Sequence, residues 1–166
     1  MPVATTKKSA KKGSKVDAGA TTLSGVYMFP NGDKYDGEYI QVGECLQRQG
    51  YGTHTTIDGL TYHGNWSGDK MNGQGELLRS SVYFKVLFTS VKTIFVNSLI
   101  TITGEFGNNM FHGFGKYTWP DGSYYEGNFN ENKLEGQGTF TDVKSQVWYG
   151  NFTHMAAPGL KFKLCM

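Results

Sequence analysis

The chain has 166 residues, which is enough for one domain but too few for a repeat array together with a typical catalytic domain. Its 23 glycines stand beside 11 phenylalanines, 10 tyrosines and 3 tryptophans, an unusual pairing for a protein with a conventional core. The net charge of +2 is divided between a basic start and a slightly acidic remainder, so we expect no nucleic-acid partner for the body of the chain.

Residues 1–22 are polar, rich in lysine and nearly free of large apolar side chains. Such a segment buries too little surface to offset its ordering entropy, so we predict a disordered tail. Its lysines are candidate contacts to an anionic surface, and the alternative is a tail that only adds solubility. They are Lys7, Lys8, Lys11, Lys12 and Lys15. No apolar stretch follows them, so we expect no secretory signal peptide and a cytoplasmic location.

From residue 23 to 166 the chain repeats one unit, whose clearest copy is YEGNFNENKLEGQGTF at residues 125–140. A tyrosine precedes a glycine by two residues, an aromatic residue follows that glycine by two, and Gly-x-Gly begins nine residues after it. The first glycines are Gly37, Gly64, Gly104, Gly127 and Gly150, and the pairs are Gly50/Gly52, Gly73/Gly75, Gly113/Gly115 and Gly136/Gly138. This gives about four full repeats and a partial terminal one.

Each unit predicts a β-hairpin. Asn31-Gly32, Asp58-Gly59 and Asp121-Gly122 supply the positive φ angles of tight turns, and each lies just before a strand with the tyrosine-glycine-aromatic element. Within that strand, alternation places all three residues on one face. The sequence therefore predicts an all-β protein, a single-layer elongated antiparallel sheet of consecutive hairpins.

Glycine inside a strand normally weakens pairing, so its recurrence needs a reason. In a single-layer sheet, large rings that lie across bare glycine backbone can cover the apolar face from within. We therefore expect a change of Gly136 or Gly138 to valine to disrupt packing, and a change at the loop residue Asn132 to be nearly neutral.

Three copies depart from the pattern. The first has four extra residues before its Gly-x-Gly, which predicts a loop insertion in VGECLQRQ. An apolar insert at residues 82–102 interrupts the array. Lys85 and Lys92 disfavour a membrane-spanning helix there, so an extra β segment packed on the array, or a poorly fitting insert from an alternative transcript, is preferred. At the end, GLKFKLCM predicts a closing strand with Lys161 and Lys163 on its outer face.

The sequence shows no sign of catalysis. Gly-x-Gly recurs in every full repeat without the third glycine or the following helix of a nucleotide-binding loop. The histidines and cysteines have no metal-type spacing, and Cys45 and Cys165 are expected to be reduced thiols. Carboxylates such as Glu38, Glu105 and Glu126 recur beside repeat glycines, which favours a structural role. We predict no enzyme, no catalytic residue, no cofactor and no metal.

The units YDGEY, YHGNW, TGEF, YEGNF and WYGNF, four of them followed by GYG, GQG, GFG or GQG, resemble MORN repeats. The resemblance implies a non-catalytic scaffold that binds protein partners, often helical or extended segments, along a concave aromatic face. Carried over to this chain, that face comprises Tyr35, Tyr39, Tyr62, Trp66, Phe106, Tyr125, Phe129, Trp148 and Phe152. The alternative is a peripheral adaptor that binds anionic phospholipid.

Two further expectations come from the resemblance alone. Some members of this family dimerise through terminal repeats, so a homodimer is possible here. The four-and-a-bit repeats after a lysine-rich start also look most like short vertebrate members, which implies a role on cytoplasmic vesicles in germ cells, such as formation of the acrosome.

Overall fold

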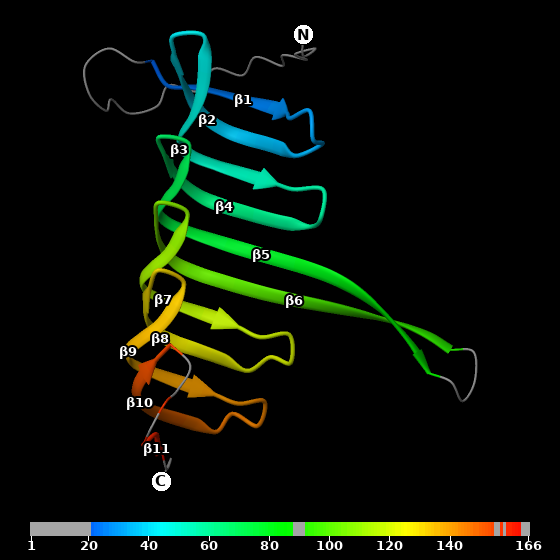
Figure 1. Cartoon of the computed structure of the whole chain (residues 1–166), viewed down its shortest axis with the longest axis vertical. Coiled ribbons are helices and arrows are strands. Elements are labelled where there is room, and N and C mark those ends of the chain that lie inside the picture. The colour runs from blue at the N-terminus through cyan, green and yellow to red at the C-terminus, as the bar shows by residue number, and fades with distance from the viewer. Residues whose placement is uncertain (1–20, 88–91, 155–156, 158, 164–166) are drawn as a thin grey trace.

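A computed structural model describes residues 21–87, 92–154, 157 and 159–163 of the chain, with only the backbone for 81–98. The predicted tail therefore lies almost wholly outside the described residues. In the described part there are eleven strands and no helix, and each strand pairs antiparallel with the next along the chain (Figure 1). The predicted all-β, single-layer, elongated antiparallel sheet of consecutive hairpins is confirmed.

The strands fall into hairpins that follow one another along the long axis of the molecule. Their bounds are β1 Leu23–Met28, β2 Lys34–Val42, β3 Cys45–Thr55, β4 Leu60–Ser67, β5 Lys70–Leu87, β6 Lys92–Gly107, β7 Met110–Thr118, β8 Tyr124–Asn130, β9 Lys133–Thr141, β10 Val147–Thr153 and β11 Lys161–Phe162.

A row of paired glycines crosses the sheet from β1 to β10. Each glycine lies opposite the next across the antiparallel ladder. The row runs Gly25, Gly37, Gly52, Gly64, Gly75, Gly104, Gly115, Gly127, Gly138 and Gly150. The backbone along this line carries no side chain on either face, which leaves space for rings from neighbouring positions.

Tyrosine rings occupy the space above the row. A Cβ added to Gly52 would lie 2.6 Å from Cζ of Tyr35, and one added to Gly138 would lie 2.6 Å from Cζ of Tyr125. The hydroxyl of Tyr35 donates to the carbonyl oxygen of Glu38 at 2.7 Å, so the ring is held at its far end as well. Tyr62 and Tyr125 donate in the same way to residues three positions on, at 2.9 and 3.2 Å.

The third repeat reaches the same packing from a different strand. It has Ile102 where the other full repeats have the tyrosine. Phe111 of β7 fills the space instead, and a Cβ on Gly115 would lie 2.9 Å from its Cε2. The ring over the glycine pair is therefore kept although the residue that supplies it changes.

The two glycines of each Gly-x-Gly have different roles. The second belongs to the row, whereas the first adopts the left-handed region, with φ of 83°, 94°, 71° and 86° at Gly50, Gly73, Gly113 and Gly136. The register shifts beside these residues, so each is part of a β-bulge. Bulges increase twist and bend a strand, and here one recurs in each full repeat, always on the same side of the glycine row.

Eight buried aromatic residues form the core. They are Tyr35, Tyr62, Trp66, Phe106, Phe111, Tyr125, Phe129 and Phe152. Their rings contact one another in an unbroken file with centroid separations from 4.1 to 5.6 Å, several of them edge to face. The file links all the repeats, so no repeat has a separate core.

The turns between paired strands also link successive repeats. Asn132 in the β8–β9 turn has φ of 67°, its side-chain Oδ1 accepts the Phe111 N–H at 2.7 Å, and its own N–H donates to the Phe111 carbonyl at 2.9 Å. Asn109 makes the same two bonds to Met71. Because this residue connects two repeats and holds a left-handed backbone, the structure favours a destabilising effect of a change at Asn132 over the nearly neutral effect that the sequence predicts.

Both insertions lengthen hairpins. The four extra residues of the first repeat extend β2 and β3 up to the pair Val42–Cys45, so the predicted loop insertion is wrong. The apolar insert continues β5 and β6, which pair from Gly73–Phe106 to Leu87–Lys92. It is β structure, but it projects away from the sheet and does not pack on the array (Figure 1). Among the described residues, no helix has the length and apolarity needed to span a membrane.

The difference between glycine positions is testable by comparing Gly138→Ala with Gly107→Ala. At Gly138 the added Cβ would collide with the Tyr125 ring, whereas at Gly107 its nearest neighbour would be His112 Cβ at 3.9 Å. We expect Gly138→Ala to lower the free energy of unfolding by about 1–3 kcal/mol and Gly107→Ala to change it by less than about 0.5 kcal/mol. Thermal unfolding followed by circular dichroism measures both. Equal melting shifts would show that the ring does not need the bare backbone.

Candidate functional site

The structure buries most of the face predicted to bind a partner. Seven of the nine predicted residues belong to the core file, with exposed fractions from 0% for Tyr125 to 8% for Phe152. Tyr39 and Trp148 are only half-buried. The predicted face thus lies on one side of the sheet, but its rings mostly contact one another and the glycine row.

A second file of rings lies beside the core file at the C-terminal end of the sheet. We call this set the aromatic shelf: Tyr117, Trp119, Phe140, Trp148 and Phe162. Neighbouring rings in it are 4.8 to 6.0 Å apart between centroids. The first four are half-buried and Phe162 is 45% exposed. The shelf therefore combines apolar area with fixed position and access to solvent.

Sequence reasoning missed four of these five residues, although a signal for two of them was present. Tyr117 and Phe140 each follow a row glycine by two residues, and alternation along a strand places them on the same face as that glycine. The same position holds Leu77 in the second repeat and His54 in the first. The aromatic residues of the repeat signature, of which the predicted face consists, are mostly the ones that the fold buries.

The opposite face of the sheet is largely polar. The carboxylate of Glu38 accepts the Tyr51 N–H at 2.7 Å, and Asn65 donates to the Gln74 carbonyl at 3.2 Å. Both residues directly follow a repeat glycine and pack against a bulge glycine. Polar side chains therefore recur at this position because they bond to and pack against the backbone of the bulge. Exposed rings on this face, such as Phe114 at 63%, lie outside both files.

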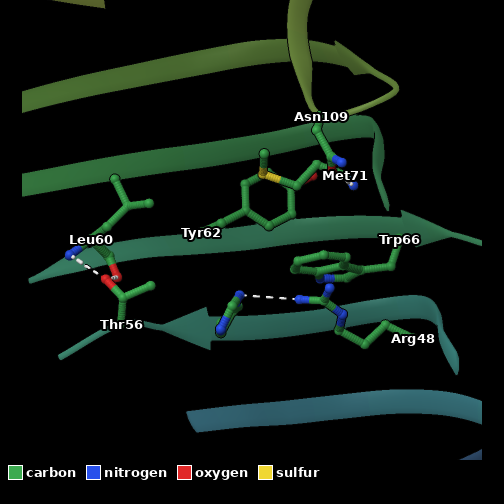
Figure 2. A pocket seen from close by; sticks show the side chains of 8 residues that line it. Arg48, Thr56, Leu60, Tyr62, Trp66, Met71 and Asn109 are labelled. Atoms are coloured by element: carbon green, nitrogen blue, oxygen red, sulfur yellow. Dashed lines mark hydrogen bonds between the residues drawn. The ribbon is translucent and has the colours of Figure 1, made fainter. Parts of the chain in front are cut away.

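The first repeat has a polar cluster where the other repeats have apolar side chains. Arg48 pairs with Tyr39 in the place that Met71, Phe111 and Leu134 take opposite their aromatic partners. Its guanidinium lies 4.0 Å from the centroid of the Trp66 ring, a cation–π contact (Figure 2).

Two acidic residues and a histidine complete this cluster. Asp69 forms an ion pair with Arg48. Nη1 of Arg48 is 3.1 Å from Nδ1 of His54, and since arginine can only donate, Nδ1 is the acceptor and the imidazole is neutral. Nε2 of His54 faces Asp33 Oδ2 at 3.4 Å. Beside the cluster is a hollow of about 170 Å³, walled by Tyr62, Leu60 and Met71 among others.

Burial sets the protonation of the groups in this face. Desolvation raises the pKa of Tyr62 to about 12, so its hydroxyl remains a donor at neutral pH. Desolvation, and next the Arg48 guanidinium, lower the pKa of His54 below its usual 6.5, while Asp33 opposes the shift. His54 is therefore neutral in the fold at pH 7, in agreement with its role as acceptor.

The described residues hold no cluster of three or more histidine, cysteine, aspartate or glutamate side chains that suits a metal ion. Cys45 in the described region is an exposed free thiol. The arrangement of this face thus offers apolar contact, cation–π contact and hydrogen bonding, which are means of binding.

A comparison with protein-family models matches the MORN repeat at residues 24–34, 62–81, 103–124 and 125–146. These segments include the second, third and fourth repeats. The hairpin with the four-residue insertion, between residues 35 and 61, lies outside the matched segments, as does the partial terminal copy. No curated protein matches the chain.

The lowered pKa of His54 makes stability depend on pH. Because the unfolded chain binds a proton to this residue more readily, the free energy of unfolding falls as pH drops below about 6.5 and is regained above it. His54→Leu, which copies the residue of the second repeat, should flatten this slope. His112→Gln, at an exposed position in β7, is the matched control and should keep it. Melting temperatures from about one pH unit below to about one unit above the ordinary histidine pKa of about 6.5 test this. An unchanged slope in the leucine variant would exclude His54 as its source.

Proposed function

We propose that this chain, four segments of which match the MORN repeat, is a non-catalytic interaction scaffold. It holds a protein partner, a helical or extended segment, against the inner face of its sheet. MORN repeats form a non-enzymatic family and generally act as modules for binding proteins or membranes. The observation that carries the proposal for this chain is the aromatic shelf, five neighbouring rings that remain accessible beside a buried aromatic core.

The shelf has the properties of a binding surface for an apolar segment. Its rings come from β7, β9, β10 and β11 and from the turn after β7, so the sheet fixes their spacing. Half-buried tryptophan and tyrosine provide large contact area at little cost in conformational entropy, and they are enriched among the residues that dominate binding energy. A partner that presents apolar side chains at intervals of one turn of helix or two residues of strand fits such a row.

The hollow beside Arg48 is a second feature of the same inner face. It lies at the N-terminal half of the sheet, so a segment that runs along the long axis meets both it and the shelf. Its apolar walls and the Arg48 and His54 nitrogens suit one side chain with an apolar body and a polar tip.

The location is part of the proposal. The resemblance of the repeats to short vertebrate members supports action in the cytoplasm, on vesicles such as the acrosome of germ cells.

The scaffold proposal is tested by affinity capture from a cell lysate with matched ring variants. Trp119→Ala and Trp148→Ala shorten the shelf, whereas Phe114→Ala removes an exposed ring from the opposite face of β7. We expect proteins retained by the native chain to be lost, or bound about tenfold or more weakly, with the two shelf variants and kept with Phe114→Ala. Circular dichroism melts of all three confirm that they fold. Retention that is equal in all variants, or lost only with Phe114→Ala, would contradict the proposal.

The second candidate is a peripheral adaptor on anionic phospholipid, and the lysines favour it. Lys161 and Lys163 are exposed at the C-terminal edge of the sheet, and five more lysines lie in residues 1–22. Each lysine near an anionic surface contributes about 1 kcal/mol, an attraction that salt screens.

Co-sedimentation of the full chain with phosphatidylserine vesicles tests this candidate. Binding at low salt that falls several-fold at about 0.15 M salt is expected if the lysines make the contact. A variant with Lys7, Lys8, Lys11, Lys12 and Lys15 changed to glutamine should then lose it, while Lys161→Gln/Lys163→Gln reports on the other end. Salt-resistant binding would assign the contact to apolar residues, and no binding would remove the candidate.

A further inference from the structure

The face of the sheet opposite the rings, which we call the outer face, is acidic along its centre. Side chains alternate along a strand, so the residues directly before and after each row glycine lie on this face. At these positions of β1 to β10 there are five carboxylates and one lysine. We call these six residues the outer band: Asp36, Glu38, Glu76, Glu105, Lys116 and Glu126.

The negative charge of the outer band is only partly neutralised. Two of its carboxylates have a lysine at ion-pair distance, Glu126 with Lys116 at 3.4 Å and Asp36 with Lys34 at 3.8 Å. Glu38 accepts a backbone N–H. In the described part of the chain, no lysine or arginine lies at ion-pair distance from Glu76 or Glu105. The band therefore offers negative charge to a further cation.

Exposed rings lie among these carboxylates. Tyr51 is 50% exposed, Phe114 63% and Tyr149 43%, and each of them flanks a row glycine on the outer face. Aromatic rings attract ammonium groups to their faces. One such contact is already present, since Nζ of Lys116 lies 3.7 Å from the centroid of the Tyr124 ring. The carboxylates and rings together suit a segment that is rich in lysine.

The chain itself contains such a segment, the tail of residues 1–22. Five lysines and one aspartate give this tail a charge of +4, and since the whole chain has a net charge of +2, the remainder carries −2. All five lysines fall between residues 7 and 15. The tail and the outer band are therefore of opposite charge.

The tail joins the sheet at one end of the outer band. β1 begins at Leu23, and in the ladder between β1 and β2 Ser24 pairs with Glu38 and Val26 pairs with Asp36. The chain therefore enters the sheet beside the first two carboxylates of the band.

The tail is long enough to follow the whole band. Neighbouring strands are about 4.8 Å apart, so Glu76 in β5 lies about 14 Å from Asp36 in β2, and Glu126 in β8 lies about 29 Å from it. An extended chain covers about 3.3 Å per residue. Measured from the start of β1, Lys15 can therefore reach about 26 Å and Lys7 about 53 Å. The lysines nearest β1 reach the carboxylates of the first half of the sheet, and the others reach the rest.

We propose that the tail lies along the outer band of its own chain, with its lysines paired to the band carboxylates, above all Glu76 and Glu105. The covalent connection favours this occupant over a similar segment of another molecule. A tail joined to the sheet is present at an effective concentration on the order of millimolar, well above that of a separate chain at micromolar concentration. The contact is between exposed charges, so it is reversible and salt weakens it.

The contact separates the tail from the inner face. With the tail on the outer band, the aromatic shelf and the hollow beside Arg48 stay open to a partner. The same lysines are then withdrawn from any other anionic surface. The inference concerns the outer face and goes beyond the scaffold proposal, so its failure leaves that proposal unaffected.

Zero-length cross-linking of the full chain tests the contact. A carbodiimide joins a carboxylate to a lysine amine that touches it, and mass spectrometry of the digest identifies both residues. At about 0.02 M salt we expect links from the tail lysines to Glu76 and Glu105, and we expect their loss at about 0.5 M salt. Glu44 and Glu131, in exposed turns, are the reference carboxylates. Links that reach these turns as often as the band, no links from the tail, or links only between isotopically labelled and unlabelled copies would each overturn the proposal.

The reactivity of the tail lysines tests the same contact with variants. Glu76→Gln/Glu105→Gln removes two charges from the band, and Glu44→Gln/Glu131→Gln removes the same number from exposed turns. Because a paired amine reacts more slowly, brief acetylation at low salt should modify the tail lysines about twofold or more faster in the band variant, and at the native rate in the turn variant. Circular dichroism melts confirm that both variants fold. Rates that rise equally in both variants, or in neither, would show that the band does not hold the tail.

Discussion

The fold depends on the contact between an aromatic ring and bare glycine backbone. A single-layer sheet has no second layer to cover its apolar face, so the rings must lie flat enough to cover it themselves. Any side chain at Gly52 or Gly138 would fill the space that Tyr35 or Tyr125 occupies. Glycine, which usually weakens a strand, is required here because the ring replaces the lost side-chain packing. The tyrosine hydroxyl donates a hydrogen bond to a carbonyl at the bulge, and this bond fixes the position of the ring over the glycines.

This dependence explains what could be predicted from the sequence. The ring and its glycine are close in the chain and recur with a fixed spacing, so the repeats, the hairpins and the glycine positions were all predictable. Burial was not predictable, because it depends on the bulges that bend each strand and on contacts between repeats. Phe111 replaces a tyrosine missing from the preceding strand, and a search for the tyrosine-glycine pattern cannot identify it. For the same reason most of the predicted binding face proved to be core, and Tyr117 and Phe140 were missed.

Both insertions continue hairpin ladders, and this has a physical reason. In a hairpin, residues added between the last two pairs can continue the ladder on both strands, and this satisfies their backbone groups at once. In a loop, the backbone groups of the same residues would need hydrogen-bond partners outside the ladder. In both the first repeat and the β5–β6 hairpin the added residues continue the ladder. The extra pairs lie beyond the glycine row, so the insertions leave the glycine pairs and the ring contacts of the core file unchanged. The repeat can thus accept long insertions without losing its packing.

The packing that joins repeats also decides what happens at the ends of the array. Each hairpin is completed by its neighbours through the glycine row, the ring file and the turn bonds such as that of Asn132. A terminal hairpin therefore lacks one of these contacts on its outer side. At the C-terminal end Leu160 and the short β11 supply it, with the Lys163 N–H bonded to the Val147 carbonyl. At β1 the described chain supplies no equivalent. The array is held together by contacts between neighbouring hairpins and is closed at its C-terminal end by its own chain, whereas β1 at the other end has β2 as its one neighbour in the described part of the chain.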